Sequence, residues 1–278
     1  MSAEGSVAAL SAARALLFVP GDRPDRFAKA AASGADGIVL DLEDAIAPAR
    51  KALARNEVRN WLRAGGRGIV RINPVGSPWY EEDVRALAGM ACPVLLPKTS
   101  SSEQVRALLD LLPPGCSVVA LLETAAGILN APAICATSGV VRAAFGNGDL
   151  GAELRLDPAN RTGLATARST VVLASAAARL APPLDGVTLS YADNAALESD
   201  LRHALDLGFG GKLCIHPGQV PLVRKAFAPS PAEVRWARDV VNADRDGSVT
   251  TVNQTMIDRP ILDRAKRILA ETGFSQRG

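Results

Sequence analysis

The chain has 278 residues, of which 48% are hydrophobic and 22% are charged, and its 31 basic and 29 acidic side chains leave a net charge of +2. This near-neutral balance argues against a nucleic-acid-binding protein, and the many aliphatic residues predict a globular fold with a large core. No apolar run of about 18 residues and no basic, apolar leader is present, so we expect neither a membrane span nor a secretory signal.

The elements that the sequence predicts alternate between short apolar runs and helical segments. Residues 1–13 are rich in Ala and Ser and predict a disordered N-terminus. Each later run is nearly continuous in aliphatic residues, as in strands buried on both faces of a parallel sheet. The predicted strands are Ala15–Pro20, Gly37–Asp41, Gly68–Ile72, Pro93–Pro97, Ser117–Leu122, Val140–Phe145, Asp185–Leu189 and Lys212–Ile215. The helices predicted between them are Pro24–Ser33, Pro48–Arg63, Pro78–Leu87, Ser102–Leu111, Ala125–Thr137, Arg161–Leu180 and Asp193–Leu207.

Eight successive β/α units favour a closed (β/α)8 TIM barrel, of the α/β class, over residues 14–228. The first predicted strand is not followed by Gly-x-Gly-x-x-Gly, which argues against a dinucleotide-binding sheet. Residues 229–278 predict a C-terminal helical extension, which we expect to act as a lid. Its helices are predicted at Pro231–Asn242 and Asp258–Glu271, after a helix at Pro217–Phe227, with a mobile linker at Asp244–Asn253 and Asp258 as an N-cap.

The four cysteines (Cys92, Cys116, Cys135 and Cys214) include no Cys-x-x-Cys pair and fit no zinc motif. Cys92 and Cys214 lie in apolar runs, where cysteine is usually a small buried hydrophobe. We therefore expect a cytoplasmic protein in a reducing compartment.

Charged side chains follow many of the predicted strands. In (β/α)8 enzymes the active site lies at the C-terminal ends of the strands, so these side chains should converge on one face. They are Arg23, Glu43, Asp44, Arg71, Lys98, Glu123, Asp149 and His216.

Glu123 and Asp149 follow adjacent predicted strands and should reach one point near the barrel axis. Two carboxylates with open positions for water and substrate suit Mg²⁺, whereas zinc would require nearby His or Cys. The alternative is a structural ion pair with Arg71 or Lys98.

Arg71 lies near the end of the third predicted strand, where its guanidinium would stabilise an enolate oxygen. The alternative role for Arg71 is structural, with its side chain packed against Glu43 or Asp44. His216 precedes a proline at a strand end, which is more often a structural turn than a catalytic base, and His203 has no assigned role.

Several stretches together resemble the citrate lyase β-subunit-like proteins, CoA-ester lyases of the HpcH/HpaI aldolase superfamily, from about residue 14 to 270. They are Leu17-Phe18-Val19-Pro20-Gly21-Asp22-Arg23-Pro24, Leu40-Asp41-Leu42-Glu43-Asp44, Val70-Arg71-Ile72-Asn73, Leu96-Pro97-Lys98, Leu122-Glu123-Thr124, Cys214-Ile215-His216-Pro217 and Met256-Ile257-Asp258-Arg259-Pro260.

The resemblance implies a homotrimer, or a hexamer of trimers, with Mg²⁺ as cofactor. It implies reversible carbon–carbon cleavage of a β-hydroxyacyl-CoA, such as citramalyl-, malyl- or citryl-CoA, into a keto acid and an acyl-CoA. Carried over residue by residue, it implies Glu123 and Asp149 as metal ligands, and Arg71 as the group that polarises the thioester carbonyl. It also implies Asp258 as a catalytic lid aspartate donated to a neighbouring subunit. Substrate-binding roles would fall on Glu43 and Asp44, which support the metal's waters, and on Arg23, Lys98 and His216.

Two positions depart from the family pattern and keep two alternatives open. Ala126 stands where the pattern has Arg, and Gly148 stands where it has Glu. These losses motivate a non-catalytic paralogue that binds an acyl-CoA or keto acid. The other alternative is a CoA-independent class II keto-acid aldolase, against which the absence of any histidine before His203 argues.

Overall fold

The computed structural model describes residues 3–244, 251–252, 255–256 and 258–272. The chain forms two compact units, Met1–Ala226 and Phe227–Gly278. Within the described residues, no helix has both the length and the apolar character needed to cross a membrane.

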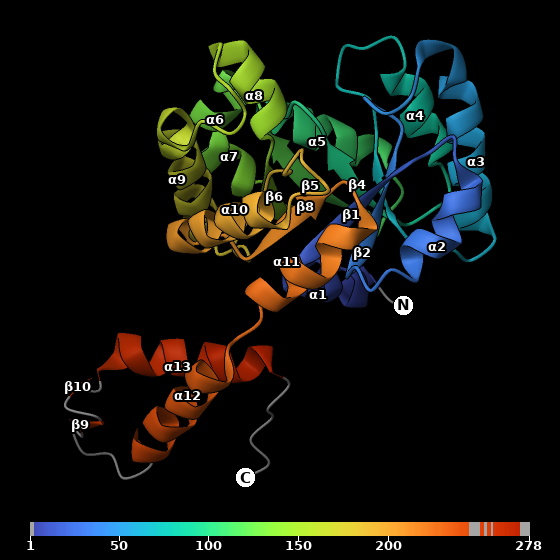
Figure 1. The fold of residues 1–278 in the computed structure, drawn as a ribbon. Coiled ribbons are helices and arrows are strands. Elements are labelled where there is room, and N and C mark those ends of the chain that lie inside the picture. The colour runs from blue at the N-terminus through green and yellow to red at the C-terminus, as the bar shows by residue number, and fades with distance from the viewer. Residues whose placement is uncertain (1–2, 245–250, 253–254, 257, 273–278) are drawn as a thin grey trace. The chain divides into compact units, whose positions relative to one another are not determined.

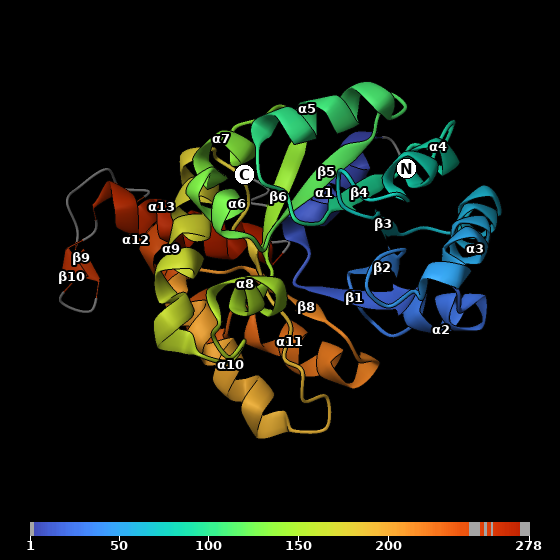
Figure 2. The ribbon, with the colours of Figure 1, turned by 90° about the horizontal axis from the view of Figure 1, so that it is seen from above.

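The first unit is a closed barrel of eight parallel strands in sequence order, in which β8 pairs with β1. Figure 1 and Figure 2 show helices ringed around these strands. This arrangement confirms the predicted (β/α)8 fold. The strands are β1 (Ala15–Pro20), β2 (Gly37–Asp41), β3 (Ile69–Arg71), β4 (Pro93–Leu96), β5 (Ser117–Leu122), β6 (Val140–Phe145), β7 (Leu184–Asp185) and β8 (Gly211–Cys214).

Helices of the first unit connect the strands and precede β1. They are α1 (Ala3–Ala12), η1 (Pro24–Arg26), α2 (Phe27–Ala31), η2 (Pro48–Arg50), α3 (Lys51–Arg63), α4 (Tyr80–Ala86), α5 (Ser102–Leu111), α6 (Ala125–Leu129), α7 (Ala131–Cys135), α8 (Asn147–Leu154), α9 (Arg161–Ala177), α10 (Asn194–Leu207), η3 (Pro217–Gln219) and α11 (Val220–Ala226).

The barrel interior is filled by aliphatic side chains from successive strands. Leu16, Val39, Ile69, Leu95 and Val119 are each at most 3% exposed and belong to one core cluster. At about 1.5–3 kcal/mol for each fully buried aliphatic side chain, this packing stabilises the ring of strands on which the site stands.

The prediction of a disordered N-terminus was wrong for residues 3–12, which form α1. Leu10 and Ala13 join the barrel core. Arg142 of β6, only 1% exposed, donates hydrogen bonds to the carbonyl oxygens of Leu10 (2.7 Å) and Ala13. A buried guanidinium satisfies the free carbonyls at the helix C-terminus, a long-range contact that an Ala/Ser-rich sequence does not reveal.

Two predicted elements differ in extent. The seventh strand was predicted at Asp185–Leu189, but β7 ends at Asp185 because the next carbonyls accept side-chain hydrogen bonds. Lys212 Nζ donates to the Gly186 carbonyl at 2.5 Å, and Gln219 Nε2 donates to the Thr188 carbonyl at 2.9 Å. The predicted helix Ala125–Thr137 is divided into α6 and α7 near Pro132, which lacks an N–H for a continuous helix.

The second unit contains α12 (Pro231–Asp244), the antiparallel pair β9 (Thr251–Val252) and β10 (Thr255–Met256), and α13 (Arg259–Glu271). The two helices share an apolar core of Ala237, Val240, Val241, Ala265, Ile268 and Leu269. Asp258 is the N-cap of α13, as predicted, and accepts the Ile261 N–H at 3.1 Å. Of the predicted linker Asp244–Asn253, residues 245–250 and 253 lie outside the described part of the chain.

Candidate active site

Five side chains predicted for the site meet at the C-terminal ends of β2 to β6. They are Glu43, Arg71, Lys98, Glu123 and Asp149. Asp149 lies in the first turn of α8, and the others stand at or just beyond their strands. The register of a parallel barrel places these strand ends side by side, so residues distant in sequence converge.

Lys98 links three of the acidic side chains. Its backbone N–H donates to Glu123 Oε1 at 2.9 Å, while its Nζ lies 2.6 Å from Glu43 Oε1 and 3.3 Å from Asp149 Oδ2. The residue has φ 49°, in the left-handed region. That conformation costs a non-glycine residue roughly 1–2 kcal/mol, and such strain is concentrated at functional sites.

Glu123 is an acid held in an environment that disfavours its charge. The side chain is 4% exposed, and burial, followed by the charges of Glu43 and Asp149, raises its pKa to about 8. Gly146 makes room for it, because a Cβ there would lie 2.4 Å from Glu123 Oε2. Glycine at this position is therefore a requirement of the site.

Arg71 is held by a clamp of carboxylates. Its Nε and Nη2 bind the two oxygens of Asp41 at 2.7 Å each, and its Nη1 lies 3.1 Å from Glu43 Oε2 and 3.3 Å from Asp44 Oδ2. The guanidinium also stacks 4.6 Å from the Phe18 ring centroid. Burial opposes the charge, but the bonds to Asp41 and the neighbouring carboxylates raise the pKa of Arg71, so it stays protonated.

Lys51 fixes the turn that carries Glu43. Its Nζ is buried and donates to the carbonyls of Leu42 (2.7 Å) and Glu43 (2.8 Å) and to Asn73 Oδ1 (2.7 Å). The ammonium also lies 4.9 Å from the Trp79 ring centroid. A cavity of about 300 Å³ opens here and is lined by Glu43, Asp44, Ile46, Pro48, Lys51, Asn73, Pro74, Ser77, Trp79 and Lys98.

Three predicted site residues have other contacts in the structure. Arg23 is paired with exposed Asp25 at 2.8 Å. His216 accepts the Gly218 N–H at 3.1 Å as the N-cap of η3, and its ring lies 5.0 Å from that of Tyr191. Asp258 belongs to the second unit, where it caps α13.

The acidic side chains outnumber the cations at this face. Five carboxylates (Asp41, Glu43, Asp44, Glu123 and Asp149) lie around three cations, the Arg71 guanidinium and the ammonium groups of Lys51 and Lys98. Glu43 Oε2 is buried without a hydrogen bond, since its approach to Arg71 lacks the right geometry.

The residues present fit a divalent cation. Within the described residues, no three His, Cys, Asp or Glu side chains converge as a ready ligand cage. The excess of oxygen ligands suits a hard cation that needs only one or two carboxylates and keeps several waters.

Comparison with known proteins agrees with this geometry. The profile of the HpcH/HpaI aldolase/citrate lyase family matches residues 14–217. The chain belongs to this family. Within this family of lyases and aldolases, the chain is 43% identical over 267 residues to a citrate lyase subunit beta-like protein of Mycobacterium tuberculosis, covering 92% of this chain and 94% of the relative. It is 35% identical over 270 residues to a (3S)-malyl-CoA thioesterase of Cereibacter sphaeroides, covering 93% and 94%.

Solved structures of the family share the fold. CitE of Mycobacterium tuberculosis, in complex with magnesium, acetoacetate and coenzyme A, superposes with a TM-score of 0.82 at 40% identity, covering 95% of this chain and 99% of that one. The citrate lyase beta subunit of the same organism, in complex with oxaloacetate and magnesium, gives 0.71 at 42% identity, covering 79% and 99%.

Sequence reasoning assigned no role to Asp41 and Lys51, and it did not indicate the contact of Gly146 with Glu123. Lys51 had a detectable signal, since Lys51, Ala54 and Val58 form one buried stripe of α3 at helical spacing. A lysine on an apolar stripe indicates a buried cation with partners. Asp41 carried no such signal, and neither did the contact between Gly146 and Glu123, because these contacts join residues distant in sequence.

Proposed function

We propose that the protein is a Mg²⁺-dependent carbon–carbon lyase that cleaves, or in reverse forms, a β-hydroxyacyl-CoA. Its products would be a keto acid and an acyl-CoA. The observation that carries this proposal is the meeting of Glu123 and Asp149 around Lys98, with the Arg71 guanidinium on the other side of Glu43.

Glu123 and Asp149 would hold the metal, and Glu43 and Asp44 would accept hydrogen bonds from its waters. The bound ion would act as a Lewis acid toward oxygens of the substrate's acid part. Magnesium in the CitE structures of Mycobacterium tuberculosis supports this assignment.

Arg71 would stabilise the negative charge that cleavage creates. As the carbon–carbon bond breaks, the substrate hydroxyl loses its proton and becomes the keto carbonyl. The electron pair moves to the acyl thioester as an enolate, and a proton then returns to carbon. A guanidinium held in one position by Asp41 would need little reorganisation as this charge develops, as an electrostatic catalyst requires.

Lys98, Arg23 and His216 would contact the anionic parts of the substrate. The Lys98 side chain is 31% exposed, and that of Arg23 is 42% exposed, so both are accessible to a carboxylate or phosphate. The cavity of about 300 Å³ has the ammonium groups of Lys51 and Lys98 in its lining, which suits the carboxylate of a small keto acid.

Asp258 would act as the lid acid that exchanges a proton with the enolate, and it would reach a neighbouring subunit in a homotrimer or hexamer. Co-expression of Glu123→Gln and Asp258→Asn chains tests this. If the lid acts across subunits, mixed oligomers recover activity that neither variant has alone. Mixed oligomers that remain inactive would exclude donation between subunits.

A direct assay separates the proposed reaction from its neighbours. The purified protein is incubated with citramalyl-, malyl- and citryl-CoA, with Mg²⁺ and with EDTA, and the keto acid and the free CoA thiol are measured separately. A lyase releases keto acid and acyl-CoA in the presence of Mg²⁺ only.

Each other result identifies an alternative. Free CoA without a keto acid would indicate a thioesterase, the activity named for the Cereibacter sphaeroides relative. Thermal stabilisation by CoA esters without any product would indicate a binding protein. Aldol formation from pyruvate and an aldehyde without CoA would indicate a class II aldolase. Any of these would refute the lyase proposal.

A further inference from the structure

Two cysteines stand side by side at the N-terminal ends of β4 and β5, the end of the barrel away from the candidate active site. The strands pair in parallel with Pro93 opposite Ser117, so the preceding residues, Cys92 and Cys116, lie at the same level. Neighbouring strands are about 4.8 Å apart. That separation lies inside the range of about 4.4–6.8 Å between Cα atoms that a disulfide spans.

The two thiol groups lie close enough for each to shift the pKa of the other. The Cys116 Sγ also donates a hydrogen bond to the Met90 carbonyl oxygen at 3.6 Å. Both side chains therefore come from adjacent positions on neighbouring strands and lie within reach of each other.

The interaction makes the two thiols differ in how readily they ionise. The interaction with Cys92 lowers the pKa of Cys116, and the same interaction, with burial, raises the pKa of Cys92. Cys116 is therefore the more readily ionised of the two thiols. A thiol that ionises more readily, beside a second thiol, is the arrangement of an attacking and a resolving cysteine.

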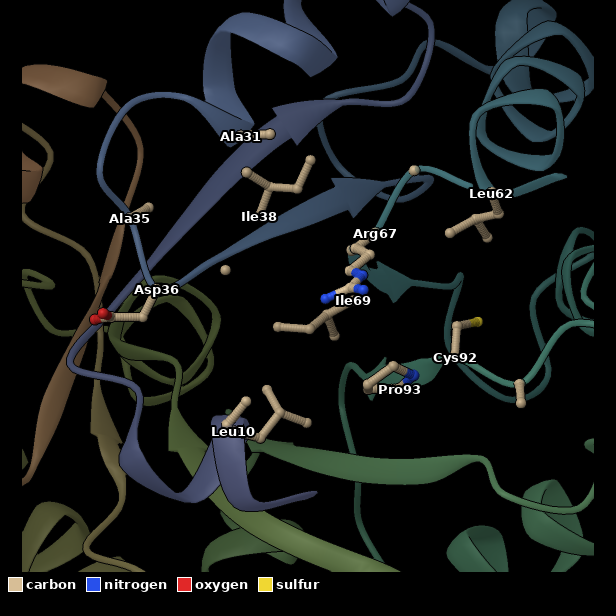
Figure 3. Close-up of a pocket in the computed structure, with 15 residues that line it drawn as sticks. Leu10, Ala31, Ala35, Asp36, Ile38, Leu62, Arg67, Ile69, Cys92 and Pro93 are labelled. Carbon is tan, nitrogen blue, oxygen red and sulfur yellow. The ribbon is translucent and has the colours of Figure 1, made fainter. Parts of the chain in front are cut away.

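Reagents can approach this pair from solvent. Cys116 is half-buried. Cys92 is 6% exposed and lies at one end of a cavity of about 520 Å³, beside Pro93 (Figure 3). The other two cysteines differ: Cys135 and Cys214 are at most 2% exposed, and burial raises their pKa values to about 11 and about 12.

We propose that Cys92 and Cys116 form a redox-active pair that low-molecular-weight disulfides convert into an intramolecular disulfide. The Cys116 thiolate attacks one sulfur of the reagent, forms a mixed disulfide and releases one thiolate. Cys92 then loses its proton and attacks the Cys116 sulfur, which forms the Cys92–Cys116 bond and releases the second thiolate. The two protein thiols lose two electrons, and the reagent is reduced to two thiols.

The test uses the full-length protein and oxidised glutathione near neutral pH. After denaturation in an alkylating agent, the free thiols are counted, and the cysteine peptides are mapped by mass spectrometry. The expected wild-type product lacks two titratable thiols and contains one peptide pair joined through Cys92 and Cys116. A thiol reductant restores the original count.

Matched variants separate the roles. Cys92→Ser should stop at a mixed disulfide on Cys116, and Cys116→Ser should lose the fast reaction. Cys135→Ser and Cys214→Ser remove cysteines outside the pair and should leave the joined peptide unchanged. A wild-type protein that accumulates the mixed disulfide, that reacts at Cys135 or Cys214, or that keeps four free thiols would overturn the proposal. This result is independent of the lyase assay.

Discussion

Two charge clusters in one barrel differ in the sign of their excess charge. In the first, Asp185 on β7 is bound by Lys212 Nζ and by Arg168 Nε at 3.0 Å each, so two cations share one carboxylate. In the second, Glu123 and its neighbours at the C-terminal strand ends place five carboxylates around three cations, Arg71, Lys98 and Lys51.

The carboxyl groups respond in opposite directions. Burial opposes ionisation of Asp185, but the charges of Lys212 and Arg168 lower its pKa. Burial and neighbouring carboxylates instead raise the pKa of Glu123. In the first cluster two cations of the chain bind one carboxylate, whereas the second has an excess of carboxylates, which suits another cation. The sign of the neighbouring charges therefore decides the direction in which each pKa moves, since burial alone would raise both.

The largest expected effect is a loss of stability when the Asp185 cluster is changed. Asp185→Asn leaves Lys212 and Arg168 buried without a countercharge, and we expect the free energy of unfolding to fall by about 3–5 kcal/mol. Urea denaturation at neutral pH measures it. Because the folded pKa of Asp185 is lowered, its contribution is present above the unfolded value and is lost as pH falls through the folded one.

A matched control for this change is Glu81→Gln. Glu81 forms an exposed pair with Arg85 at 3.9 Å, and removing such a pair costs about 0–1 kcal/mol. Equal destabilisation by the two variants would mean that the buried cluster does not contribute as its geometry indicates.

The next effect is on catalysis. Arg71→Lys keeps a positive charge beside Asp41 but loses the paired hydrogen bonds, so we expect a folded protein whose kcat is lower by about 10²–10³-fold. Arg71→Ala is a poorer test, because Asp41 is 1% exposed and would be left as a buried, unpaired charge. Circular dichroism checks the fold, and unchanged turnover of Arg71→Lys would refute the assigned role.

A smaller effect on stability is expected for Glu123→Gln in EDTA, and it is a gain, whereas Asp185→Asn causes a loss. The folded pKa of Glu123, about 8, lies above its ordinary value of 4.5, so the stability of the metal-free protein falls as pH rises between these values. Glutamine removes the charge and keeps an acceptor for the Lys98 N–H. We expect a gain of about 1–3 kcal/mol at neutral pH.

The same variant should gain no stability from added Mg²⁺, whereas the wild type should. Urea denaturation with Mg²⁺ and with EDTA measures both effects. A Glu123→Gln protein that is less stable than wild type in EDTA would show that the ionised carboxylate stabilises the fold.

The barrel could be predicted from sequence because each strand is a continuous apolar run with its own local signal. The strand ends then placed Glu43, Arg71, Lys98, Glu123 and Asp149 on one face, which the structure brings together. What could not be predicted depends on long-range contacts. The helix α1 is held by Arg142 from β6, and β7 is shortened by Lys212 and Gln219.

In the candidate site, too, some features have a local sequence signal and others depend on long-range contacts. The roles of Asp41 and Gly146 arise only when Arg71 and Glu123 arrive from other strands. The departures from the family pattern also depend on surroundings. A Cβ at Gly148 would meet nothing within 4 Å, so the space beside Asp149 is open in this chain. Substrate specificity is set in such spaces, which a strand pattern does not describe.

The smallest expected effect separates structure from binding at His216. Its ring accepts the Gly218 N–H and begins η3, so His216→Ala should cost about 1 kcal/mol through loss of the cap. His216→Asn supplies another acceptor and should restore that stability. If His216 also contacts substrate, the Asn variant keeps wild-type stability while its KM rises, and if the residue only caps the turn, both stay unchanged. Thermal unfolding together with KM for the CoA ester decides between these roles.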